Sequence, residues 1–407
     1  MAETRPPGPD APRMFSDWGI YRAFYTDDEI AAVASESACI SAWLYFEQAV
    51  ARAQAELGLV PAAAAEAIGA LRLEDIDYET LVDETRVVGR PILPLADAMR
   101  RTLPEAHRPY VHKGLTTQDA IDTGHAILLR DAAAIVDTRL AGLIGRFADI
   151  ARDHAETPML GRTIGQAARP TTFGFRVAVW VVELQRHRRR IAAAAAGAAT
   201  VQLGGAVGTL DGQGGRGREL RRLVADALGL AVEPITTQSA RDGTIAFLLT
   251  LAGLGASVEK IARELAFLAA TGVGEIRFRQ PPGTGASSAM PHKANPSLLE
   301  FAEACAGLAK TRGASALDAA GHRGDREGGV WLREWPTLIE TLHYAASALR
   351  HLGDAAAVLD VDATAMEKSL AALPAEARAG DDLASAAAET RAALAEIDAG
   401  CVGWSQL

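Results

Sequence analysis

The chain has few cysteines, and this scarcity narrows the classes of protein it can belong to. Cys39, Cys305 and Cys401 are widely separated among the 407 residues and lack the spacing of a metal site. Such usage favours a reducing compartment, and we expect the protein to be cytoplasmic. The opening residues contain proline and glycine but no apolar core of the kind a signal peptide needs, so we expect no export.

Aromatic residues are also scarce, at 5% of the chain, whereas hydrophobic residues reach 49%. With alanine and leucine prominent, this mixture favours helices packed through small side chains over a sheet protein. The longest apolar stretch, 244–258, is too short to span a bilayer and predicts a buried core helix. The net charge of −10 argues against nucleic acid as the main partner, although local basic clusters could bind small anions.

The spacing of apolar residues and prolines predicts an all-α protein in three parts. Prolines interrupt the early chain repeatedly, which indicates an N-terminal domain of short helices, residues 1–110. A central domain, 111–354, contains five segments that read as helices of 18 residues or more, and such helices should lie side by side as a bundle. Residues 355–407 predict a small C-terminal domain with one alanine-rich helix, 375–399. The five long segments are 117–155, 171–199, 236–270, 296–317 and 335–352.

Residues 283–296 have the chemistry of a mobile loop that carries a reactive hydroxyl beside a cation. Their sequence is Gly-Thr-Gly-Ala-Ser-Ser-Ala-Met-Pro-His-Lys-Ala-Asn-Pro, in which Ser287 and Ser288 supply hydroxyls without bulk. Lys293, one of five lysines against 36 arginines, offers an ammonium group to an anionic substrate. Asn295 is expected to cap the following helix, whose free N–H groups favour a carboxylate. The alternative to a reactive loop is that residues 283–296 form a simple connector that only caps the following helix.

Further polar groups stand at other predicted helix ends. One helix start is surrounded by His112, Thr116, Thr117 and Gln118. A helix needs only one capping side chain, so the surplus of polar groups suits a carboxylate-binding pocket. Arg241 stands at another helix start, where its guanidinium could grip a carboxylate through two hydrogen bonds. The remaining polar loops are 89–94 with Arg90, 160–166 with Thr163 and Gln166, and 325–335 with Arg326.

Two motifs could indicate nucleotide or phosphate binding. Residues 212–217 match Gly-x-Gly-x-x-Gly, but no strand precedes them and no βαβ pattern surrounds them, so we reject a dinucleotide site. The arginine-rich run 186–190 could bind phosphate, but a solvated face or a subunit contact is the commoner meaning of such a run. A purely nucleotide-binding module is therefore a minor alternative.

The polar loops together closely resemble the conserved regions of the fumarase/aspartase superfamily. Residues 283–296 are similar to its signature Gly-Ser-Ser-x-Met-Pro-x-Lys-x-Asn-Pro, with Ala286 where the family usually has glycine. Residues 112–119 are similar to its His-x-Gly-x-Thr-Ser-Gln-Asp, with Thr117 in place of serine. The resemblance covers nearly the whole chain, although the C-terminal part is shorter than this family leads one to expect.

Three other stretches extend the resemblance. Residues 161–166 are similar to Gly-Arg-Thr-His-Gly-Gln, with Ile164 in place of histidine. Residues 89–95 and 325–335 resemble the branch that contains 3-carboxy-cis,cis-muconate cycloisomerase more than they resemble adenylosuccinate lyase. The resemblance implies a homotetramer with a shared helical core, in which each active site collects loops from three subunits.

The resemblance also implies a mechanism that uses no metal and no organic cofactor. A proton leaves the carbon next to a carboxylate of a small polycarboxylate, and a group is then lost from the neighbouring carbon. Ser287 would be the base, with its oxyanion stabilised by Lys293 and by backbone donors, and His112 would also be catalytic. Substrate contacts would come from Arg90, Thr116, Thr117, Gln118, Thr163, Gln166, Arg241, Ser288, Met290, Asn295 and Arg326.

Ile164 is the most informative departure from the family pattern, because isoleucine cannot protonate an amine leaving group. One interpretation is a leaving group that departs as a stable anion, such as a carboxylate in a cycloisomerase or nitrite in a nitrosuccinate-type elimination. Another is that His112 or a water supplies the proton. We expect a lyase or cycloisomerase acting on a succinate-like polycarboxylate. The alternatives are adenylosuccinate or argininosuccinate lyase activity and a non-catalytic, crystallin-like protein.

Overall fold

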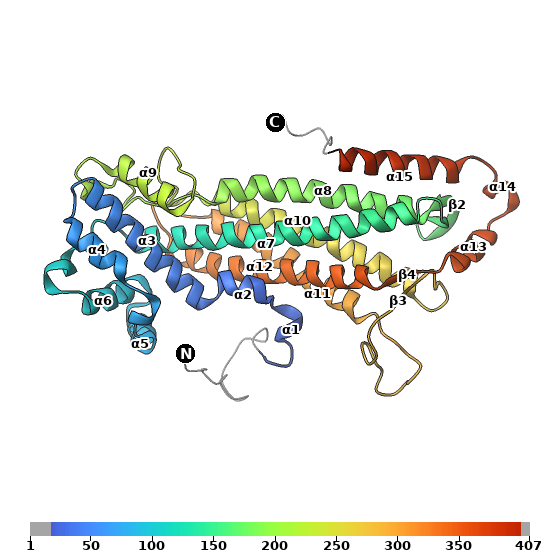
Figure 1. The fold of residues 1–407 in the computed structure, drawn as a ribbon, viewed down its shortest axis with the longest axis horizontal. Helices are drawn as coiled ribbons and strands as arrows, with labels where there is room; N and C mark the ends of the chain where they lie inside the picture. Colours follow the sequence, from blue (N-terminus) through green and yellow to red (C-terminus); the bar gives the residue numbers. More distant parts are fainter. Residues whose placement is uncertain (1–17, 400–407) are drawn as a thin grey trace.

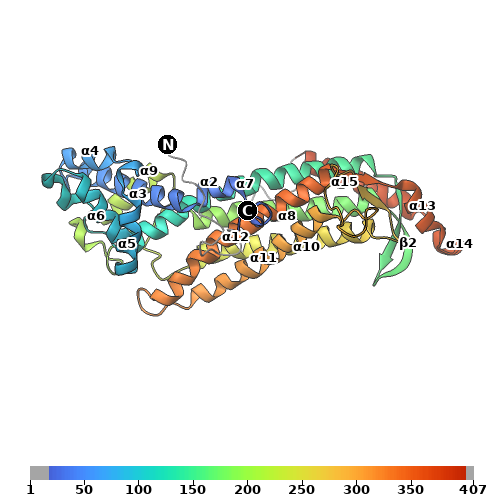
Figure 2. The same cartoon turned by 90° about the horizontal axis from the view of Figure 1, so that it is seen from below.

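The computed structural model describes residues 18–399 and shows an elongated helical molecule (Figure 1). Two features of the sequence lie outside the described residues: the opening residues 1–17, for which we expect no signal peptide, and Cys401. Five long helices run side by side along the molecule in two perpendicular views (Figures 1 and 2). This bundle confirms the predicted all-α fold. Its helices are α7 (Thr117–Asp153), α8 (Phe173–Ala198), α10 (Asp242–Ala269), α11 (Ser297–Ala314) and α12 (Gly328–Ala357).

The helix boundaries follow local chemistry. α7 begins at Thr117, as predicted, because the Asp119 carboxylate accepts the backbone N–H of Thr116 and so satisfies a free donor at the helix start. α12 begins at Gly328, earlier than predicted, and contains Pro336. A proline inside a helix removes one backbone hydrogen bond, but the packing of a 30-residue helix outweighs that loss here.

Five helices gather around the end of the bundle where α7 begins, which we call the threonine end after Thr116 and Thr117 (Figure 1). They are α3 (Glu36–Glu56), α4 (Ala62–Ala70), α5 (Tyr78–Val88), α6 (Ile92–Thr102) and α9 (Gly217–Leu228). The chain returns to this end after α8, and α9 packs against α3. The division at residues 110 and 354 stays a prediction, although α9 lies beside helices that the sequence assigned to another domain. The first two helices lie along the bundle instead: α1 (Arg22–Tyr25) packs against α11 and α12, and α2 (Asp28–Ala34) packs against α7 and α12. Short 3-10 turns occur at Leu73–Asp75, Glu105–Tyr110 and Asp211–Gln213.

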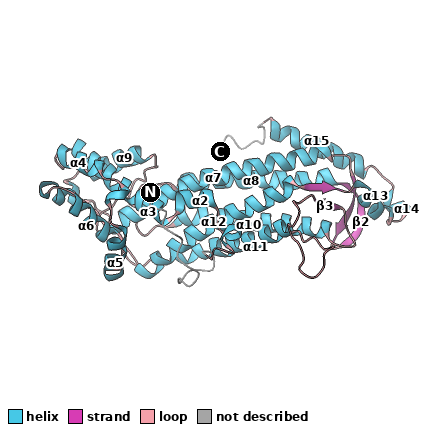
Figure 3. Cartoon of the chain, turned by 60° about the horizontal axis from the view of Figure 1, so that its bottom comes forward, coloured by secondary structure: helices cyan, strands magenta, loops and turns pink. Residues whose placement is uncertain are grey.

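The opposite end of the bundle carries the short strands, and we call it the hairpin end (Figure 3). Strands β1 (Pro158–Thr163) and β2 (Gln166–Thr172) form an antiparallel hairpin, and β3 (Ile276–Phe278) pairs with β4 (Leu359–Val361). The predicted single helix 375–399 is wrong, because Gly380, at φ 126°, separates two helices. The last helices are α13 (Ala363–Ala371), α14 (Ala375–Arg378) and α15 (Asp382–Asp398), and a 3-10 turn, Ser315–Ala320, follows α11.

The core of the bundle is centred on α10. Within the described residues it is the one helix long and apolar enough to cross a membrane, but most of its apolar window is buried against α8, α11 and α12. It is therefore a core helix, as its sequence predicted. Glycines allow its close approach to α11: a Cβ on Gly255 would lie 2.7 Å from the Ala306 carbonyl oxygen, and one on Gly313 would lie 2.6 Å from that of Leu248.

Candidate active site

The start of α7 is fixed by a buried carboxylate, that of Asp119. It accepts the backbone N–H groups of Thr116 at 3.0 Å, Gly204 at 2.8 Å and Gly205 at 3.0 Å. Burial raises the pKa of Asp119 to about 6, although these three hydrogen bonds favour its charged form. Asp119 thus ties the threonine end to the glycine-rich passage 202–210 and holds the backbone that carries Thr116 and Thr117.

Gln118 connects the start of α7 to the loop before α12. Its side-chain amide donates to Asp122 at 2.9 Å and to the Gln238 carbonyl oxygen at 2.7 Å, and its Oε1 accepts the Nε–H of Arg326 at 2.7 Å. Gln118 is fully buried and its side-chain amide is already paired within the chain, so its contact with substrate stays a prediction. Gln118 positions Arg326, which is partly exposed and has no carboxylate partner among the described residues.

The sequence predicts that Arg241 binds a substrate carboxylate, and within this chain its guanidinium pairs with two protein carboxylates. Its side chain is 6% exposed, and its Nη1 lies 2.6 Å from Asp122 while its Nε lies 2.9 Å from Glu334, which also pairs with Nη2. Burial alone would lower the pKa of Arg241, but the two carboxylates hold it above its ordinary value. Trp331 donates its Nε1–H to the other oxygen of Asp122 at 2.8 Å. Arg241 therefore joins α7, α10 and α12 in a buried ion-pair network.

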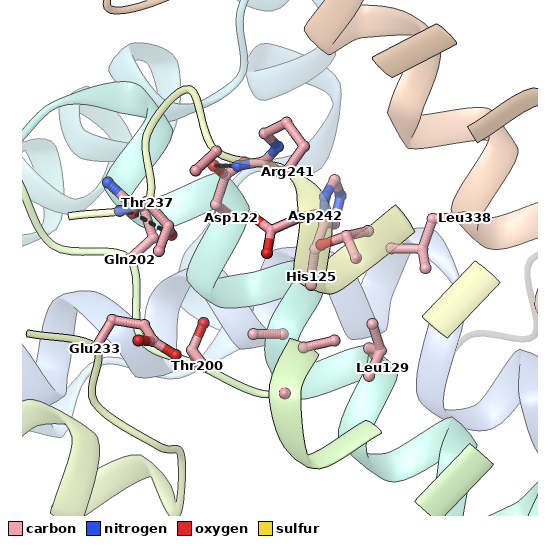
Figure 4. A pocket seen from close by; sticks show the side chains of 16 residues that line it. Asp122, His125, Leu129, Thr200, Gln202, Glu233, Thr237, Arg241, Asp242 and Leu338 are labelled. Atoms are coloured by element: carbon pink, nitrogen blue, oxygen red, sulfur yellow. Dashed lines mark hydrogen bonds and ion pairs between the residues drawn. The ribbon is translucent and has the colours of Figure 1, made fainter. Parts of the chain in front are cut away.

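This network also borders a cavity of about 200 Å³ (Figure 4). Ligand atoms of Asp122, His125 and Glu334 lie within 4.8 Å of one another, as groups that hold a metal would. The Arg241 guanidinium already contacts both carboxylates and supplies the positive charge that a cation would bring. Burial lowers the pKa of His125, which favours its neutral form. We assign this cluster to the ion-pair network and not to a metal centre.

His112 is held at the threonine end by a buried acid that the sequence analysis missed. Its Nδ1 lies 2.6 Å from Oε1 of Glu47 on α3, and the Glu47 side chain is 3% exposed. Burial would lower the pKa of His112, but Glu47 raises it above its ordinary value by charge attraction and hydrogen bonding. His112 also has a left-handed backbone, at φ 58°. The pair favours the protonated, charged form of His112.

Arg90 reaches the same end of the bundle. Its guanidinium lies 5.8 Å from the centre of the Trp331 ring and 5.9 Å from that of Trp335, distances typical of cation–π contacts. A Cβ on Gly328 would lie 3.4 Å from its Nη2, so Arg90 approaches the start of α12. One end of the bundle therefore carries Arg90, Arg326, Thr116 and Thr117, as an anion-binding site requires.

The loop 283–296 links β3 to α11 and projects from the bundle toward the hairpin end (Figure 1). The backbone N–H and the side-chain amide of Asn295 both donate to the Gly285 carbonyl oxygen, at 2.9 and 3.0 Å. The prediction that Asn295 caps the helix is wrong, because Pro296 is the capping residue and the Asn295 side chain closes the loop instead. The Met290 N–H donates to Ser287 Oγ at 3.1 Å. Ser288, Met290 and Lys293 are exposed.

The hairpin carries Thr163 and Gln166 at its exposed tip, far from the threonine end (Figure 1). α7 has 37 residues and spans about 55 Å between these two ends. Arg162 anchors the hairpin through an ion pair with the fully buried Glu275. Ile164, at the turn, is completely exposed. One chain therefore does not bring the hairpin tip or the loop 283–296 to the threonine pair.

Comparisons with known proteins agree with this architecture. The family model described as Lyase matches residues 22–309. The chain is 34% identical to 3-carboxy-cis,cis-muconate cycloisomerase of Pseudomonas putida over 86% of this chain and 84% of that protein. It is 35% identical to nitrosuccinate lyase of Streptomyces davaonensis over 87% of this chain and 77% of that protein.

The fold comparison gives the same result. The crystal structure of the 3-carboxy-cis,cis-muconate lactonizing enzyme from Pseudomonas putida superposes with a TM-score of 0.83 at 31% identity. The superposition covers 87% of this chain and 80% of that one. The chain therefore belongs to the lyase family of the fumarase/aspartase superfamily, and it is a lyase or an intramolecular lyase.

Proposed function

We propose that this enzyme catalyses an elimination on a succinate-like polycarboxylate in which the departing group is an anion, as in a 3-carboxy-cis,cis-muconate cycloisomerase. The observation that carries this proposal is Ile164 at the fully exposed hairpin tip, where the family pattern has histidine. A departing carboxylate has a pKa of about 4 as its acid, so it leaves without a proton at neutral pH. An amine leaving group would need an acid that isoleucine cannot supply.

The site residues take the following roles in the proposal. Ser287 removes the proton next to a substrate carboxylate, the bond electrons form the carbon–carbon double bond, and the bond to the leaving group breaks. The Met290 N–H already donates to Ser287 Oγ and would stabilise its oxyanion together with Lys293. Removing one such donor typically lowers the rate by about 10²–10³-fold.

The other proposed contacts come from two places. At the threonine end, Arg326 and Arg90 offer guanidinium groups, and Thr116 and Thr117 offer hydroxyl groups, to the substrate carboxylates. Asn295 would turn from the Gly285 carbonyl oxygen toward the substrate when the loop closes, together with its neighbours Ser288 and Met290. At the hairpin tip, Thr163 and Gln166 would orient the leaving group.

We propose that a homotetramer brings these places together. The distance between the two ends of α7 supports this proposal, since the loop and the hairpin tip of one chain lie far from its own threonine pair. In an assembly of antiparallel bundles, the hairpin end of one copy would lie beside the threonine end of another.

A second candidate is adenylosuccinate or argininosuccinate lyase activity. The contact between His112 and Glu47 favours it, because a histidine kept protonated by a buried acid could supply the proton that an amine leaving group needs.

The two candidates are separated by incubating the enzyme with 3-carboxymuconolactone, 3-carboxy-cis,cis-muconate, nitrosuccinate, adenylosuccinate and argininosuccinate while absorbance is followed. We expect turnover of an anion-leaving substrate that Ser287→Ala abolishes and that the matched surface variant Ser37→Ala leaves unchanged. Turnover of an amine-leaving substrate alone would favour the second candidate. Equal rates for Ser287→Ala and the unaltered enzyme would refute the role of the loop.

A further inference from the structure

A separate cavity of about 440 Å³ lies beside α9, away from the candidate active site. α9 stands with α3 and α4 beyond the threonine end (Figure 1). The cavity wall contains three arginines from α9, and the short segment 232–234 closes the other side. The arginines are Arg218, Arg221 and Arg222.

Arg221 is the buried member of this group, with 5% of its surface exposed. Its Nε donates to the Leu203 carbonyl oxygen at 3.0 Å, and its Nη1 donates to the Glu233 carbonyl oxygen at 3.5 Å. No carboxylate within the described part of the chain forms an ion pair with it, although the lowering of the Arg221 pKa by burial is partly opposed by the charge of Asp119. A buried guanidinium without a directly paired counterion is costly, because burial removes the water that stabilises its charge.

The two other arginines add positive charge to the same wall. Arg218 and Arg222 lie one helical turn apart, both are exposed, and neither forms an ion pair with any described residue. Like charges at this spacing destabilise a helix. One acid, Glu233, also lines the α9 cavity, and its carboxylate lies beside Thr200 in the cavity that borders Arg241 (Figure 4). Three arginines against one acid leave an excess of positive charge in the wall of the α9 cavity.

We propose that the α9 cavity binds a small anion with two or more negative charges, of the kind represented by inorganic phosphate and by dicarboxylates. The guanidinium groups provide several N–H donors in planar arrays that match the oxygens of such anions. The cavity volume exceeds what either ion needs, so the anion would keep part of its hydration.

The site is distinct from the candidate active site, because the glycine-rich passage lies between them. Leu203 faces Arg221 on one side, whereas the next two residues, Gly204 and Gly205, donate to Asp119 on the other. An anion in the α9 cavity would therefore contact neither Arg326 nor the loop 283–296.

Calorimetric titration of the full chain with inorganic phosphate, and separately with succinate, tests this proposal at constant ionic strength. The exposed pair is changed in Arg218→Ala/Arg222→Ala, which leaves the buried Arg221 in place. The matched control is Arg52→Ala/Arg146→Ala, which removes two exposed arginines that also lack ion pairs among the described residues. A further variant, Arg326→Ala, identifies binding at the candidate active site.

We expect the α9 variant to weaken binding by about tenfold or more, since it removes two charged donors. The control pair should bind both titrants as the unaltered protein does. Arg326→Ala should keep the binding that the α9 variant loses, and it should lose only the succinate bound at the candidate active site. The titrant whose binding the α9 variant weakens more identifies the anion as phosphate or carboxylate. Three results would refute the proposal: an equal loss in the control pair, which would mean general charge attraction; a loss in Arg326→Ala without a loss in the α9 variant, which would place all of the bound anion in the active site; and no measurable binding of either titrant.

Discussion

Replacing Arg241 with methionine tests whether this arginine holds the fold together or binds substrate. The change leaves the carboxylates of Asp122 and Glu334 buried without their common cation, and both side chains are at most 5% exposed. Breaking a buried ion pair by removing one partner typically costs about 3–5 kcal/mol. We expect Arg241→Met to lower the free energy of unfolding by about that amount, since screening by solvent is small at this burial.

The assay is unfolding in urea at fixed protein concentration, because assembly would otherwise shift the apparent stability. The surface variant Arg52→Met serves as the matched control and should change stability by less than about 0.5 kcal/mol. Adding Asp122→Asn and Glu334→Gln to Arg241→Met should recover part of the loss, because no buried charge then lacks a partner. A stability loss below about 1 kcal/mol, together with a large rise in KM, would refute this account and return Arg241 to the substrate site.

Three further predictions concern residues nearer to the chemistry. Glu47→Gln should move the alkaline limb of the kcat/KM pH profile to lower pH, because the raised pKa of His112 falls when its partner loses charge. The stability contributed by this pair is present below the ordinary histidine pKa and is lost as pH rises through the raised one. Gly285→Ala should lower kcat/KM by about tenfold or more, since its Cβ would lie 2.1 Å from the Asn295 carbonyl oxygen. Gly283→Ala is the matched control, because Gly283 has the same kind of left-handed backbone but open space where the Cβ would lie. Ile164→His should leave stability and the anion-leaving reaction nearly unchanged; a large gain on an amine-leaving substrate would indicate a decayed amine lyase.

The parts of the fold that depend on local chemistry were predictable from the sequence. The five long helices follow from apolar spacing and helix-end residues, and the start of α7 at Thr117 was located correctly. Asn295 was misassigned as a cap because Asn-Pro before an apolar run has the same local pattern, whether the amide caps the helix or closes the loop. The break at Gly380 carried a signal, a glycine followed by two aspartates, that the alanine-rich pattern concealed.

The parts of the site that depend on distant partners were not predictable in this way. Glu47 lies 65 residues from His112, and Asp122 lies 119 residues from Arg241. Nothing near either position in the sequence distinguishes a paired charge from a free one, so Arg241 was expected to meet substrate. The one sequence signal that could have indicated a buried partner was the helical spacing that places Asp122 one turn after Gln118.

Subunit mixing tests whether the loop with Ser287 acts on substrate held at the threonine end of another copy. Ser287→Ala and Arg326→Ala should each be inactive, but unfolding and refolding them together would create sites with an intact serine and an intact arginine from different chains. Random equal mixing predicts recovery of about a quarter of the unaltered activity. No recovery in mixed assemblies, with each variant correctly folded, would contradict the account, because it would place both residues of one site in a single chain.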